Sequence, residues 1–139
     1  MLKPRSCSVL SERRGHETEH HRAMKRALAR LWTLLGWMVL FEEQLCDVVA
    51  WKCRADGRMF ILAIEAERST RNIRNVTRNL SRRCDRVLVT VTDETLRIAF
   101  RRKLWSVLLH DLLVKVGVTT IKRIEQTITR LEKRPHDPR

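Results

Sequence analysis

The segment from residue 47 to residue 67 limits most strongly which folds this chain can adopt. Two apolar stretches, 47–51 and 59–64, flank a polar turn at 54–58 that contains Gly57. Apolar runs of this length on either side of a glycine turn are typical of a β-hairpin. We therefore expect two antiparallel strands here, and the other elements must pack against the sheet that these strands begin.

The rest of the sequence alternates between helical and strand patterns. Apolar residues recur at helical spacing between Gly15 and Gly36, where Gly36 is a predicted C-terminal cap, and a short apolar run follows at 37–42. The later predicted elements are helices at 69–83, 94–104 and 121–131 and strands at 86–91 and 112–118, with Ser69 or Thr70 and Thr92 or Asp93 as helix caps. This order predicts an α/β fold in which helices cover both faces of a mixed central sheet.

Composition limits the environment and the partners. Residues 15–134 are predicted to form one domain, between a flexible basic arm at 1–14 and a flexible tail at 135–139. The 29 Lys and Arg residues outnumber the 16 Asp and Glu residues, and the net charge of +13 predicts an anionic partner. No apolar run reaches the roughly 18 residues that a membrane span needs. The cysteines form no Cys-x-x-Cys pair, so we expect reduced thiols in an intracellular, cytoplasmic protein.

Three carboxylates differ from the others because they border the apolar strands. Asp47 opens the first hairpin strand, and Glu65 and Glu67 close the second. Side chains alternate along a strand, so Glu65 and Glu67 project from the same face about 7 Å apart. Acids gathered in this way repel one another unless a hard divalent cation binds between them, and oxygen ligands favour Mg²⁺ or Mn²⁺.

The hairpin register decides whether Asp47 joins the two glutamates. A three-residue loop that ends at Gly57 in the left-handed conformation pairs Arg54 with Arg58 and places Asp47 opposite Glu65. A two-residue type I′ loop instead turns Asp47 to the other face of the sheet. The sequence allows both registers, and only the first creates a metal site.

These residues resemble a known family. Asp47, a hairpin and then Glu65-Ala66-Glu67, within an αβββαβ order of elements, resemble the PD-(D/E)xK superfamily of restriction-endonuclease-like nucleases, and the small Holliday-junction-resolvase-like members look most similar. The resemblance implies that Asp47 and Glu65 bind the metal and that the residue at position 67 orients or deprotonates the attacking water. Glu67 stands where the family usually has Lys, so Lys52 or Arg71 is a candidate for a base that has moved.

The resemblance also implies a further catalytic acid on the first helix. The apolar stripe of that helix centres near Glu17, which favours Glu17, whereas the spacing from Gly15 favours Glu19. The same stretch, residues 16–20, matches the H-E-x-x-H zinc-protease pattern. It stands at the very start of the helix rather than inside an apolar one, so we interpret the match as chance, with adventitious zinc at His16, His20 and His21 as the plainer expectation.

The predicted helix at 69–83 bears a row of arginines. At about 100° per residue one side carries Arg71, Arg74, Arg78 and Arg82, the opposite side carries Ile73, Val76, Leu80 and Cys84, and the flank carries Asn72, Asn75 and Asn79. No acid interrupts residues 68–84. Arginine rows suit phosphate groups, so this surface predicts DNA binding that is largely independent of sequence.

Together these features predict a metal-dependent DNA endonuclease that hydrolyses phosphodiester bonds, with junction or mobile-element DNA as a candidate substrate and a homodimer as a candidate assembly. The alternative, motivated by Glu67 at the usual Lys position, is a non-catalytic nucleic-acid-binding module on a nuclease-like fold.

Overall fold

A computed structural model describes residues 18–41, 46–81 and 84–134 of the chain. Five strands form one sheet in the order in which they occur in the sequence: β1 (Met38–Phe41), β2 (Val48–Cys53), β3 (Met59–Glu67), β4 (Arg86–Val91) and β5 (Val116–Thr120). The pairs β1–β2 and β2–β3 are antiparallel, whereas the pairs β3–β4 and β4–β5 are parallel. The predicted α/β fold with a mixed central sheet is therefore confirmed.

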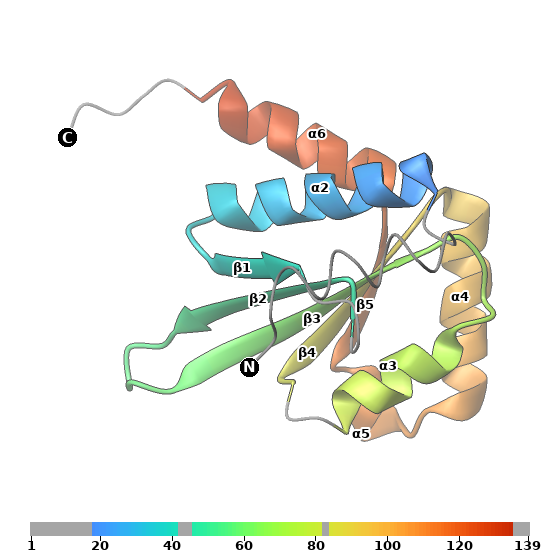
Figure 1. Cartoon of the computed structure of the whole chain (residues 1–139). Coiled ribbons are helices and arrows are strands. Elements are labelled where there is room, and N and C mark those ends of the chain that lie inside the picture. Colours follow the sequence, from blue (N-terminus) through green and yellow to red (C-terminus); the bar gives the residue numbers. More distant parts are fainter. Residues whose placement is uncertain (1–17, 42–45, 82–83, 135–139) are drawn as a thin grey trace.

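Helices cover both faces of the sheet. Helices α2 (Glu19–Leu34) and α6 (Ile121–Glu132) lie side by side on one face, and α3 (Ile73–Leu80) and α4 (Glu94–Val107) lie on the other (Figure 1). The short helix α5 (His110–Leu113) connects α4 to β5. Among the described helices, none is both long enough and apolar enough to cross a membrane.

Each face of the sheet has its own apolar core. On the α2 side, Met24, Leu28 and Leu31 pack against Ala50 and Ile64. On the α3 side the core consists of Cys46, Ala63, Ile73, Val76, Val87, Val89, Val91, Phe100 and Leu104. Alternation along each strand sends neighbouring residues to opposite cores, which explains why the central strands are apolar nearly throughout.

The hairpin has the three-residue loop. The Arg54 N–H donates to the Arg58 carbonyl oxygen at 2.7 Å, the Gly57 N–H donates to the Arg54 carbonyl oxygen at 3.0 Å, and Gly57 has a φ of 84°. Strand pairing then runs from Cys53 opposite Met59 to Val48 opposite Ile64. Continuing this register by one residue places Asp47 opposite Glu65, so the first of the two predicted registers is correct.

Several helix ends follow from local sequence. Gly36, with a φ of 87°, ends α2 as predicted, and the Gly36 and Trp37 N–H groups return to the Thr33 and Trp32 carbonyls. At the start of α2, the Thr18 hydroxyl accepts from the His21 N–H, and Asp93 caps α4 through the Leu96 N–H.

Two predicted elements were wrong in their limits. The strand predicted at 112–118 begins only at Val116, because residues 110–113 close the turn α5 and β5 continues to Thr120. The helix predicted from Ser69 begins only at Ile73. The Ser69 hydroxyl accepts from the Arg71 N–H two residues on, an arrangement that favours a turn over a helix cap.

We predict that Gly57→Ala lowers the free energy of unfolding by about 1 kcal/mol, because a residue with a Cβ is strained at positive φ. No atom lies within 4 Å of the added Cβ, so the cost comes from the backbone alone. Gly117→Ala in β5 is the matched control, since Gly117 lacks a positive φ. Urea denaturation measures both changes, and equal changes in the two variants would contradict the loop conformation.

Candidate metal centre

The sheet brings Asp47, Glu65 and Glu67 together. Asp47 precedes β2, the two glutamates end β3, and one carboxylate oxygen from each residue lies within 4.8 Å of the others. The three acids share the face of the sheet that α3 covers, since Glu65 and Glu67 pair with Val89 and Val91 of the core on that side. This group of three is called the acidic cluster below.

The acidic cluster is largely withdrawn from water. Glu65 and Glu67 are 3% and 4% exposed, and the Asp47 side chain is 18% exposed. Asp47 is held in place by its Oδ2 atom, which accepts a hydrogen bond from the Ala66 N–H at 2.7 Å. The backbone between the two glutamates therefore fixes the third acid.

Two amide side chains from the start and body of α3 hold the glutamates. Asn79 Nδ2 donates to Glu65 Oε1 at 2.8 Å, and Asn79 is only 1% exposed. The Asn72 side chain, just before α3, hydrogen-bonds to Glu67. Both contacts favour the charged form of the glutamate that receives them.

A basic side chain reaches the cluster from the opposite layer. His21 Nε2, on α2, lies 3.1 Å from the Ala66 carbonyl oxygen and 3.4 Å from Asp47 Oδ1. A carbonyl oxygen only accepts, so Nε2 carries a proton in this contact. His21 thus joins α2 to the edge of the acidic cluster.

Burial and mutual repulsion raise the pKa values of both glutamates. Removal from water, followed by the negative charges of Asp47 and Glu67, raises the pKa of Glu65 to about 9. Removal from water also raises the pKa of Glu67 to about 7, although the Asn72 hydrogen bond opposes the rise. Without a cation, the cluster therefore retains protons that a divalent ion would displace, because such an ion favours the charged carboxylates.

The other predicted site residues have different outcomes. Glu17 and Arg82 lie outside the described residues. Glu19 is exposed and pairs with Arg26 at 3.2 Å, so it does not belong to the cluster. Lys52 was a wrong candidate for the base, because it lies five residues along the strand from Asp47 and alternation turns it to the other face.

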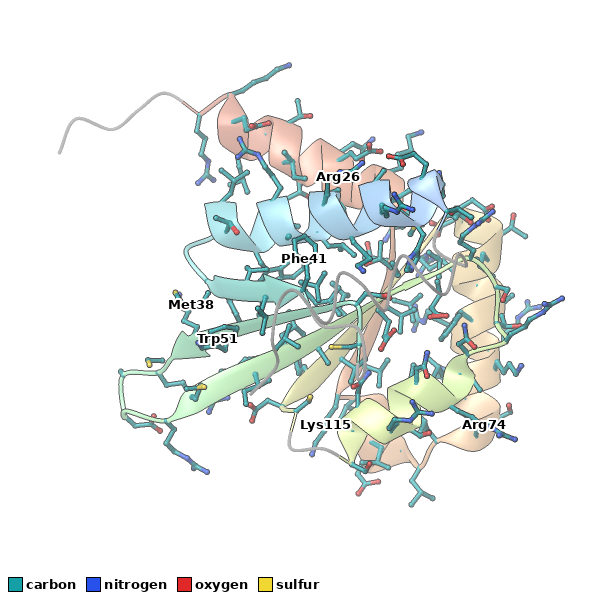
Figure 2. The ribbon with its side chains drawn as sticks, in the orientation of Figure 1. Arg26, Met38, Phe41, Trp51, Arg74 and Lys115 are labelled. Carbon is teal, nitrogen blue, oxygen red and sulfur yellow. The ribbon has the colours of Figure 1, made fainter. Side chains whose placement is uncertain are left out.

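Arginines lie on the outer side of α3. Arg74 and Arg78 are exposed while Ile73 and Val76 are buried, as the helical period predicts, and Arg71 is exposed in the turn that precedes the helix. Figure 2 shows Arg26 on α2 and Arg74 on the opposite side of the molecule. We call Arg71, Arg74 and Arg78 the arginine surface.

Sequence reasoning missed His21 and Asn79. His21 stands three, seven and ten residues before Met24, Leu28 and Leu31, so the apolar stripe of α2 already contained it. Asn79 was predicted on the flank of its helix, but it is buried against the sheet. Its position on the wheel lies between the polar and apolar sides, and only the angle at which α3 packs decides which way it faces.

No protein-family model matches the chain, and no curated protein matches it at a significant level. The restriction-endonuclease-like assignment therefore stays a prediction that depends on Asp47, Glu65 and Glu67 and on the order of the elements.

We predict that the metal-free protein loses stability as the pH rises. Both glutamates have higher pKa values in the folded chain than their ordinary 4.5, so their contribution is complete below pH 4.5 and is lost as the pH passes through about 7 and 9. Glu65→Gln mimics the protonated form, so its melting temperature should fall less between pH 5 and 9.

Differential scanning calorimetry in EDTA, with the wild type and Glu65→Gln compared at each pH, measures this difference. Glu125→Gln, an exposed acid on α6, is the control and should follow the wild type. Parallel curves for the wild type and Glu65→Gln would contradict the raised pKa values.

Proposed function

We propose that this protein is a metal-dependent DNA endonuclease and that the acidic cluster is its catalytic centre. The proposal depends above all on one observation: three carboxylate oxygens lie within 4.8 Å of one another in a largely buried site of a protein with a net charge of +13. Oxygen ligands at this spacing suit Mg²⁺ or Mn²⁺, and perturbed carboxyl groups of this kind concentrate at functional sites.

Each residue of the cluster has a distinct part in the proposal. Asp47 and Glu65 supply metal ligands, and Glu67, next to them and only slightly exposed, orients or accepts a proton from the attacking water. A bound divalent cation would stabilise the negative charge that develops in the phosphodiester transition state, and it would lower the pKa of a bound water molecule. His21 contacts both the Asp47 carboxylate and the Ala66 carbonyl oxygen, and it thereby holds Asp47 against β3.

The arginine surface gives the proposal its substrate class. Its arginines follow Glu67 closely in the sequence, and α3 packs against β3, which carries both glutamates, and against β4. Exposed guanidinium groups bind phosphate without reading bases, which suits the backbone of DNA as the ligand. A second copy of the chain would supply the second centre that cleavage of both strands requires.

Glu67 favours a second candidate function. The resembled family usually has Lys at this position, and a third acid in its place favours a nucleic-acid-binding module without catalysis. In that case DNA binding would be salt-dependent and independent of divalent cations.

We predict that the protein cleaves plasmid or four-way-junction DNA with Mg²⁺ or Mn²⁺, and that Asp47→Asn and Glu65→Gln each reduce the rate at least 100-fold because each removes a charged ligand. Gel electrophoresis of the products measures the rate. Glu125→Gln serves again as the control. DNA binding without cleavage in every metal tested would favour the binding module instead.

We predict that Arg74→Gln and Arg78→Gln each weaken DNA binding and each reduce the slope of log affinity against log salt by about 1, because each removes a phosphate contact. Fluorescence anisotropy with labelled duplex at several salt concentrations measures this slope. Arg130→Gln, an exposed arginine on α6 across the sheet, is the matched control. Equal losses in all three variants would show that net charge alone, and not the arginine surface, binds DNA.

A further inference from the structure

Asn79 is an unusual residue for its place in the core. The inward side of α3 otherwise presents the apolar side chains of Ile73 and Val76, yet Asn79 on the same helix is 1% exposed. Burying an amide costs free energy unless it forms hydrogen bonds. Its Nδ2 atom makes such a bond with Glu65 Oε1 at 2.8 Å, which directs the amide at the centre of the acidic cluster.

We propose that Asn79 is a positioning residue of the metal centre, and this inference rests on the function proposed above. By donating to Oε1, the amide fixes the orientation of the Glu65 carboxylate within the acidic cluster. The donor has no ionisable proton, so it acts in the same way at every pH.

The place of Asn79 on α3 gives this contact a second consequence. Its neighbour in the chain, Arg78, belongs to the arginine surface, and Asn72 at the start of the same helix holds Glu67. One rigid helical segment therefore carries both the phosphate-binding groups and the amides that orient two of the three acids. A purely structural role would require only that the side chain fill space, and a leucine could do this.

The test measures how Mn²⁺ binds, by electron paramagnetic resonance of the free ion, and how the cleavage rate depends on Mn²⁺ concentration. Asn79→Leu keeps a side chain of similar size and removes the donor. We expect the Mn²⁺ concentration at half-saturation to rise about 10- to 100-fold in both measurements. Asn75→Leu, a half-buried asparagine one turn earlier on α3, is the matched control and should stay within about twofold of the wild type.

DNA affinity in EDTA separates positioning from damage to the helix, and it should be the same in the wild type and both variants. If Asn79→Leu lowers only the amount of active protein and leaves the half-saturating Mn²⁺ concentration unchanged, Asn79 has a structural role and the inference is overturned. If Asn79→Leu does not fold, Asn79→Ala takes its place, because it only removes atoms. The same rise in the half-saturating Mn²⁺ concentration is expected for Asn79→Ala, and an unchanged value would again overturn the inference.

The failure of the inference can be told apart from the failure of the proposed function. A wild-type protein that binds Mn²⁺ and cleaves DNA, with an unchanged midpoint in Asn79→Leu, retains the function and loses the positioning role. A wild-type protein that binds no Mn²⁺ loses both.

Discussion

The repulsion among three largely buried carboxylates is the constraint on which the rest of this structure depends. Asp47, Glu65 and Glu67 lie close together in a site with little water, where like charges raise one another's pKa values. The surroundings offset part of this cost through the Ala66 N–H and two asparagine amides. A fold that keeps such an arrangement gives up stability in the metal-free state, and a cation that binds the acids would restore it.

The chain separates its charges by depth. Arginines occupy the outer side of α3, whereas the acids lie beneath, at the ends of strands. Positive charge at the surface attracts a polyanion over a distance set by the ionic strength, while the buried negative charge acts only on what comes close enough to lose its water. The positive and the negative charges of this region therefore act at different depths.

The sequence predicted the features that depend on local patterns. Gly57 and Gly36 mark positive-φ positions, strand alternation places Glu65 beside Glu67, and helical spacing separates Arg74 from Val76. The choice between two hairpin registers could not be made from the sequence, because both loops use Gly57 at a positive φ and only the packing of the two strands selects between them. The angle at which α3 meets the sheet is likewise a tertiary property, and it brought Asn79 inward. The strand predicted at 112–118 failed because its first residues satisfy a helical turn equally well.

Strand β1 has a consequence for how the protein behaves in concentrated solution. It is an edge strand without a charged side chain, and Met38 and Leu40 are 62% and 46% exposed. Met38, which pairs with Trp51, lies at the end of the sheet remote from α4 (Figure 2). Exposed apolar edges promote strand addition between molecules, and the charge of +13 opposes it by keeping copies apart. At an ionic strength of 0.1 M, salt screens that repulsion beyond about 10 Å. The colloidal stability of this protein should therefore decline as ionic strength rises, because screening of the like charges favours self-association through the edge of β1.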